Sequence, residues 1–140
     1  MSSQVNNIAV GTNCIDGVNS IPSSCTLPCS EPYYCHTSNS ISPHEWLVIT
    51  VTGYSVNKVV VYNNIECCQE RINNAKLIHS YDFAGTSIIH QSSFGSTASL
   101  VYTFDFSTTT YVRIQQTTSM ILNLIEVEMY YNNVKVPLSG

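Results

Sequence analysis

Hydrophobic and polar residues alternate with a period of two along most of this chain beyond residue 45. Such alternation is typical of β-strands that bury one face, whereas a helix needs a period of 3.6. In the stretch SLVYTFDF, for example, Leu100, Tyr102, Phe104 and Phe106 fall on one face. The pattern predicts six strands, at Glu45–Val51, Asn57–Tyr62, Ala75–Phe83, Ser99–Phe106, Thr110–Gln116 and Ile121–Tyr131.

The first 45 residues follow a different pattern. They hold four of the six cysteines, are rich in proline and alternate little. We expect a loop-rich segment that disulfides hold together, because it has little strand pairing of its own. Short polar turns join the six strands, and this arrangement is typical of an all-β sandwich. No linker or internal repeat is visible, so residues 1–140 are predicted to form a single domain.

Charged residues are scarce and limit the classes of partner. Lys and Arg total 5, Asp and Glu total 9, the formal net charge is -4, and charged residues make up 10% of the chain. Typical domains carry about a quarter. A surface of Asn, Ser, Thr and Tyr suits a neutral polar partner. It argues against nucleic acid, which needs a dense Lys/Arg face, and against charge-driven binding to anionic lipid.

Two further function classes lack sequence support. No run approaches the ~18 apolar residues that a membrane span needs, so we expect no membrane insertion. The chain contains no Gly-x-Ser-x-Gly, no His-Glu-x-x-His and no phosphate loop. We therefore predict that the protein is not an enzyme.

Cysteine usage points to an oxidising compartment. The chain has six cysteines, at positions 14, 25, 29, 35, 67 and 68. An even number in a small chain favours disulfides, although reduced buried thiols stay open as an alternative. Cys25, Cys29, Cys35 and His36 also offer zinc-ligand types, at a spacing that matches no common zinc finger. The N-terminus lacks the basic start and apolar body of a signal peptide. We expect an extracellular or particle-surface protein that starts at its mature N-terminus or is exported by another route.

The adjacent Cys67 and Cys68 raise a specific question, because they stand at the end of an apolar strand and just before Arg71. Consecutive Cα atoms lie about 3.8 Å apart, whereas ordinary disulfides need roughly 4.4–6.8 Å, so a bond between these two closes a strained ring. Such strain is tolerated mostly at functional sites. The ring would offer a flat apolar face to the C–H face of a sugar. Arg71 would donate hydrogen bonds to the hydroxyls, and Glu66 would orient Arg71 or accept from a hydroxyl. The alternative is that each cysteine bonds elsewhere.

The residues around this pair resemble a known family. The stretch KVVVYNNIECCQERINNA is similar to the central motif of the F-type lectins (fucolectins), in which an apolar strand leads to a vicinal Cys-Cys pair and a second basic residue. NIAVGTNCIDGVNS resembles the calcium-holding start of that family, and YYCHTSNSISPHEWLVITV resembles its histidine loop and Trp-bearing strand. YVRIQQ and LNLIEVEMY resemble the last strands of the wider discoidin and coagulation-factor C-type group. The similarity covers most of the chain in the right order.

The resemblance implies an eight-stranded antiparallel jelly-roll sandwich, discoidin-like, that binds fucose or a related neutral glycan at one end. The implied sugar-binding residues are His36, Asn64, Glu66, Cys67, Cys68 and Arg71, and from their place in the same loop Tyr33 and Tyr34 are further candidates. The implied structural Ca²⁺ would be held by Asn13, Asp16 and Glu126. Oxygen ligands of this kind suit a hard cation.

The sequence departs from the family pattern at three positions. Asn64 stands where the family has its first arginine, and Glu66 stands in place of an aspartate. Ile125 replaces a cysteine that ties the last strand to the N-terminal loop in the family. Loss of a charged donor removes hydrogen bonds worth about 1.5–3 kcal/mol each, so the sugar preference could differ. The N-terminal cysteines are then expected to bond among themselves.

Three interpretations follow from these residues. The first is a lectin for fucosylated or related glycans, which we expect to form a homo-oligomer or array because single sugar sites bind weakly. The second is a structural or docking module, such as a coat or virion-surface component, on the same scaffold with a degenerate sugar site. The third, a lipid-headgroup module, fits poorly because basic residues are scarce. The first and second differ in whether the pocket beside Cys67, Cys68 and Arg71 is open to solvent.

Overall fold

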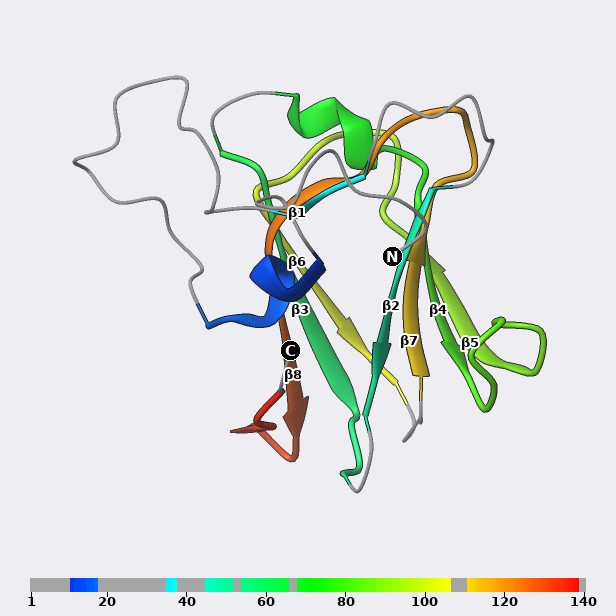
Figure 1. Ribbon diagram of the computed structural model, residues 1–140, viewed down its shortest axis with the longest axis vertical. Helices are drawn as coiled ribbons and strands as arrows, with labels where there is room; N and C mark the ends of the chain where they lie inside the picture. The colour runs from blue at the N-terminus through cyan, green and yellow to red at the C-terminus, as the bar shows by residue number, and fades with distance from the viewer. Residues whose placement is uncertain are drawn as a thin grey trace.

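The computed structural model describes residues 11–17, 35–37, 45–51, 54–65, 68–106 and 111–138. These residues form two antiparallel β-sheets packed face to face (Figure 1). Across these ranges no helix is long and apolar enough to cross a membrane.

The first sheet is built around the longest strand of the described chain. Its strand order is β1-β8-β3-β6, and β9 pairs with β8 off this path. The bounds are β1 Cys35–His36, β3 Lys58–Asn63, β6 Val101–Asp105, β8 Asn123–Tyr131 and β9 Val134–Lys135. Every residue of β8 from Asn123 to Met129 is buried, because the core covers one face and the N-terminal turn and β9 segment lie against the other.

The second sheet has the order β2-β7-β4-β5. Its strands are β2 Trp46–Thr50, β4 Lys76–Ser80, β5 Ile88–Ser93 and β7 Tyr111–Gln115. The apolar faces of the two sheets form one core, which includes Leu47, Val61, Leu77, Ile114 and Val127. Alternation along each strand creates this arrangement, since residues two apart point to the same face.

The predicted all-β sandwich is confirmed, and all six predicted strands are present. The third of them, predicted at Ala75–Phe83 and observed as β4, ends at Ser80 instead of Phe83. Tyr81 N donates to Ser87 O at 3.1 Å, and Gly85 has φ +74°, so the chain turns here. The structure describes nine strands where eight were expected, and two of these have only two residues.

The hydrophobic pattern did not predict three of the observed strands or the two short helices. β5 reads IIHQSS and is mostly exposed, so it carries little apolar alternation. β1 and β9 are too short to show a period. The 3-10 helices η1 (Gly11–Ile15) and η2 (Gln69–Ile72) are each about one turn long. Helical periodicity needs several turns to become visible.

Two opposite ends of the sandwich can be defined from β8, whose nine residues span about 27 Å. Asn123 begins β8 at the end where η2 lies, and Tyr131 ends it near the β8–β9 hairpin (Figure 1). We call these the η2 end and the hairpin end. A register shift between Tyr62 and Asn63, where β3 pairs with β8, re-aims the chain as it enters the η2 end.

Trp46 does not belong to the core cluster, although a buried strand tryptophan is usually a core residue. Leu47 takes the core position on β2, so Trp46 faces outward. The Arg113 guanidinium carbon lies 4.4 Å from the Trp46 ring centroid, and Phe83 packs edge-on at 5.8 Å. Trp46 therefore supports the outer face of the second sheet and lies on a different strand from the predicted sugar-binding residues.

Candidate functional site

Two predicted sugar-binding residues from distant parts of the chain meet at the η2 end. His36 lies on β1 and Arg71 on η2, and Arg71 Nη1 lies 3.3 Å from His36 Nε2. Arginine can only donate, so His36 Nε2 must accept, which places the proton of the neutral ring on Nδ1. Both side chains are partly exposed. The pair therefore presents a cationic donor and an imidazole beside each other at the surface.

Asn64 lies next to this pair but is buried, with 2% of its surface exposed. Its Nδ2 donates to Asn123 Oδ1 at 3.1 Å. Asn123 is the register partner of His36 across β1 and β8. Asn64 thus connects the end of β3 to the strand beneath His36, and one of its donor groups is already used inside the protein.

Cys68 is the N-cap residue just before η2 and adopts the left-handed conformation, with φ 61° and ψ 29°. Its carbonyl accepts from Arg71 N at 3.0 Å, which closes the turn that carries Arg71. A non-glycine residue in this region is uncommon and is often found at functional sites. Four other predicted sugar-site residues, Tyr33, Tyr34, Glu66 and Cys67, lie outside the described residues, so the vicinal disulfide stays a prediction.

Two buried amides that the sequence analysis did not select hold this end together. Asn63 Nδ2 donates to Gln69 O and to Ser99 O, each at 3.0 Å, and its Oδ1 accepts from Asn64 N at 2.9 Å. Gln116 Nε2 donates to the carbonyl oxygen of Arg71. The two amides fix the backbone of η2 to the end of β3 and to the residue that follows β7, and Asn63 also holds the segment before β6. The sequence does contain a sign of the role of Asn63: this amide ends the apolar strand β3 at a position that falls on the same face as the buried Val59 and Val61.

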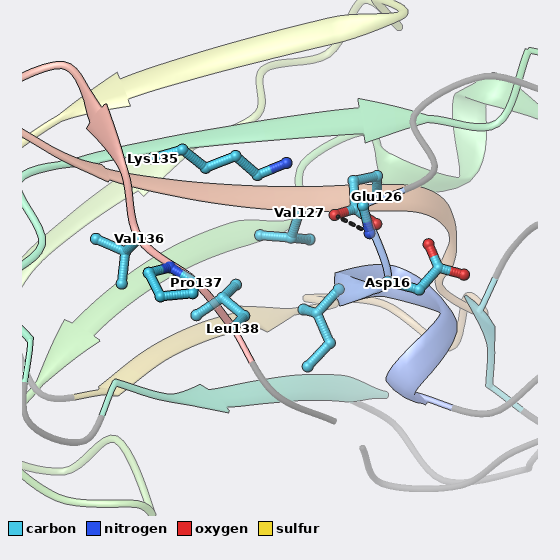
Figure 2. A pocket seen from close by; sticks show the side chains of 9 residues that line it. Asp16, Glu126, Val127, Lys135, Val136, Pro137 and Leu138 are labelled. Carbon is cyan, nitrogen blue, oxygen red and sulfur yellow. Dashed lines mark hydrogen bonds between the residues drawn. The ribbon is translucent and has the colours of Figure 1, made fainter.

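The predicted calcium ligands Asp16 and Glu126 line one cleft of ≈ 330 Å³ (Figure 2). Figure 2 shows both carboxylates at one end of the cleft, with Val136, Pro137 and Leu138 toward the other. Glu126 Oε1 accepts from Gly17 N at 3.1 Å, which holds the N-terminal turn against β8. Gly17 has φ +88°, a conformation that glycine adopts without strain.

The electrostatics of Glu126 suit a bound cation. Glu126 is 1% exposed, and its Oε2 is buried without a hydrogen-bond partner. Burial, and then the nearby charge of Asp16, raises the pKa of Glu126 to about 7 despite the hydrogen bond from Gly17, which lowers it. A divalent cation would supply the missing partner and favour the ionised form.

The donor set at this cleft fits calcium in type. Asn13 is partly buried on η1, three residues before the exposed Asp16. Carboxylate, amide and backbone oxygens are the ligands that Ca²⁺ uses. Within the described ranges, no three His, Cys, Asp or Glu side chains gather to hold a metal ion. Calcium here would therefore depend on the amide and on backbone carbonyls as well as on the two carboxylates.

A disulfide between Cys14 and Cys35 links η1 to β1, with the Cα atoms 5.4 Å apart. Two of the four N-terminal cysteines thus bond to each other, as expected from the loss of the family's tether at Ile125. Cys14 Sγ also lies 3.7 Å from Leu124 O, so the bridge sits against β8. The zinc alternative loses Cys35 to this bond, and Cys25 and Cys29 lie outside the described residues.

Comparison with known proteins bears on the fold. No model of a protein family matches the sequence, and no curated protein matches it significantly. Among solved structures, the Streptococcus pneumoniae fucose binding module SpX-3 is similar with a TM-score of 0.74 and 20% identity, over 94% of this chain and 91% of that chain. The lectin domain of lectinolysin, complexed with Lewis B antigen, has a TM-score of 0.71 and 20% identity, over 94% of this chain and 89% of that chain.

An F-lectin (fucolectin) from the serum of striped bass, Morone saxatilis, has a TM-score of 0.69 and 22% identity. The match covers 91% of this chain and 44% of the bass lectin. These structures share the discoidin-like sandwich with the chain described above. The protein therefore has the fold of fucose-binding modules and F-type lectin domains, as the resemblance around Cys67 and Cys68 predicted.

Proposed function

We propose that this protein is a lectin that binds fucose or a related neutral glycan at the η2 end and performs no chemistry on it. The observation that carries the proposal is the contact between Arg71 and His36, which are 35 residues apart in sequence and meet at 3.3 Å on a partly exposed surface. A guanidinium donates in a fixed fork, so the Arg71 N–H groups that do not point to His36 can donate to sugar hydroxyls, while His36 orients the fork.

Three further observations support the proposal. Buried amides fix the backbone of η2, so Arg71 is held in place before a ligand binds. The scarcity of charged residues agrees with a neutral ligand. The Cys14–Cys35 disulfide agrees with an extracellular or particle-surface location.

Asn64 sets the expected difference from the fucose-binding pattern. Its buried amide donates to Asn123, so it does not replace the first arginine of that pattern as a second cationic donor. We infer that the sugar is held mainly from one side, by Arg71 and His36. Binding is then weaker than in a site with two arginines, or directed to a related sugar.

Replacing Arg71 with alanine is expected to remove glycan binding, with a loss of about 1.5–3 kcal/mol or more, a factor of about ten to a hundred in Kd. The measurement is a glycan array with oxidised protein, followed by titration calorimetry on the best glycan. Arg113→Ala is a matched control, because Arg113 lies on the outer face of the second sheet, 4.4 Å from Trp46. A wild-type array without signal would contradict the lectin proposal.

We also propose that Asn13, Asp16 and Glu126 hold a structural Ca²⁺. Calcium at a hundred times its Kd is expected to stabilise the protein by about 2.7 kcal/mol, because only the folded state brings these ligands together. Thermal unfolding with calcium and with chelator measures the effect. Glu126→Gln keeps the shape of the side chain and removes its charge, so calcium should no longer raise Tm. Glu70 is an exposed acid on η2, so Glu70→Gln is the control and should keep the calcium-dependent rise in Tm. An equal shift in the Glu126 variant would count against the site.

One observation favours the second candidate, a structural or docking module on the same scaffold. The amide of Asn64, at the position of a family sugar contact, is buried and bonded within the protein. In that case the η2 end would be covered by a neighbouring molecule instead of a sugar. The glycan array distinguishes the two candidates, and light scattering tests the homo-oligomer or array that either would form.

A further inference from the structure

A second cleft, of ≈ 480 Å³, lies at the hairpin end. One wall comes from the β2–β3 connection and the other from the β8–β9 hairpin and the segment after it. The lining residues are Tyr54, Ser55, Tyr131, Asn132, Val134, Lys135, Val136 and Pro137. The cleft is separated from the Arg71–His36 contact by the length of β8, about 27 Å.

The two walls of this cleft are joined by reciprocal hydrogen bonds. Asn57 Nδ2 donates to Asn132 Oδ1 at 3.0 Å, and Asn132 N donates to Asn57 Oδ1 at 3.1 Å. Lys58 Nζ donates to Asn133 Oδ1 at 2.5 Å. Asn132 and Asn133 have φ values of 50° and 66°, which fix a tight turn between β8 and β9. The shape of the cleft is therefore set in the absence of a ligand.

Each wall presents a tyrosine to solvent. Tyr54 is 52% exposed and Tyr131 is 42% exposed. Val134 is 70% exposed beside them, and Val136, 5% exposed, is buried. Large apolar side chains that gather in one hollow mark a binding site more often than chance exposure does. A tyrosine ring also has a hydroxyl that can donate or accept.

The one charged side chain of the cleft lining is neutralised within the protein. Lys135 Nζ lies 2.5 Å from Glu128 Oε1. Glu128 is 4% exposed and accepts from Tyr62 OH at 2.9 Å and Tyr130 OH at 2.8 Å. Burial alone would raise the pKa of Glu128, but the hydrogen bonds from Lys135, Tyr130 and Tyr62 lower it overall, so Glu128 stays ionised opposite Lys135. The cleft therefore offers hydroxyls, an amide and ring faces without a net charge.

We propose that the cleft between Tyr54 and Tyr131 is a second binding site, for a neutral saccharide. The apolar C–H face of the sugar packs on the tyrosine rings, and its hydroxyls bond to Ser55, Asn132 and the phenol groups. This site is independent of the Arg71–His36 site, since it shares no residue with it. Because Lys135 is paired with Glu128, the cleft offers no free charge to a charged ligand. The hydroxyls of a sugar both donate and accept hydrogen bonds, as do the hydroxyl and amide groups that line the cleft.

Two sites at opposite ends would make a single copy of the chain bivalent. A protein with two linked sites can gain avidity of 10²–10⁴ on a surface that presents both glycans, even when each site is weak. In that case, cross-linking of glycan-bearing surfaces would not require an oligomer of this chain.

The test is an NMR titration of the ¹⁵N-labelled full chain, oxidised, with methyl glycosides of L-fucose, D-galactose, D-mannose and N-acetyl-D-glucosamine. At least one sugar should shift the amides of Tyr54, Ser55, Tyr131 and Asn132. Tyr54→Ala and Tyr131→Ala should each weaken this binding about tenfold. Arg71→Ala should leave it unchanged. Tyr81→Ala is the matched control, because Tyr81 is 69% exposed and lies outside the cleft.

Two results would overturn the proposal. One is that none of the four sugars shifts the cleft amides in protein with a well-dispersed spectrum. The other is that a hexaproline peptide shifts them and no sugar does, which would make the cleft a peptide groove. If either tyrosine variant fails to fold, Val134→Arg fills the cleft without removing packing and should abolish the shifts. Shifts at the cleft without shifts around Arg71 would sustain this proposal while the lectin site at the η2 end fails.

Discussion

Replacing Cys14 and Cys35 together with alanine is expected to lower the free energy of unfolding by about 3 kcal/mol. The disulfide spans 21 residues, and a bridge over a loop of this size restricts the unfolded chain by about that amount. Both side chains are buried in the core, at 0% and 1% exposure, so lost packing adds to the effect. In thermal unfolding, Tm should fall by about 10 °C.

The same substitution should also weaken the proposed calcium site. The bridge holds η1 against β1, which in the described part of the chain pairs with β8 at two register positions, Cys35 with Leu124 and His36 with Asn123. Without the disulfide, η1 is no longer covalently tied to β1, so the hydrogen bond from Gly17 N to Glu126 Oε1 is held less firmly. Chelator should then change Tm less in the variant than in the wild type. A loss of stability below about 1 kcal/mol would show that the bridge is not a structural element.

Acidification from pH 6.5 to pH 4 is expected to destabilise the protein through His79. This side chain is fully buried on β4, and neither ring nitrogen has a hydrogen-bond partner. It stacks on Phe106, with ring centroids 3.4 Å apart, and lies opposite His90 at 5.9 Å. Burial, and then the charge of His90, lowers the pKa of His79 from 6.5 to about 4.

The sign follows from proton binding in the two states. The unfolded chain protonates His79 below pH 6.5, whereas the folded protein resists protonation until about pH 4. Between these values the unfolded state binds more protons, so stability falls as the pH falls. The full difference corresponds to about 3 kcal/mol, and below pH 4 this residue adds no further loss. Denaturant unfolding at a series of pH values measures the slope.

His79→Leu isolates this effect. Leucine fills a similar volume without unpaired polar atoms, so stability at pH 7 should be unchanged or greater and the acid-dependent loss should shrink. The comparison is needed because the raised pKa of Glu126 acts in the opposite direction, lowering stability as the pH rises from 4.5 to about 7. His90→Gln, an exposed control on β5, should keep most of the slope, and an unchanged slope in His79→Leu would refute the assignment.

The sequence by itself determined the all-β sandwich and the main strands. Period-two alternation marks strands such as β6, where Tyr102 and Phe104 face the core. It could not mark β5, because a mostly exposed strand at the edge of a sheet needs few apolar residues. The resemblance around Cys67 and Cys68 predicted the type of sandwich and selected Arg71 and His36 as sugar-binding candidates.

Only the tertiary structure decided which of these residues act together. The contact between His36 and Arg71 depends on the pairing of β1 with β8 and on the position of η2, neither of which has a periodic signal. The burial of Asn64 depends on its bond to Asn123, 59 residues away. The cleft of Tyr54 and Tyr131 arises because two turns meet at the far end of the sandwich. Alternation fixes which face a residue occupies, but contacts across loops are set by strand register and chain packing, which a linear pattern does not contain.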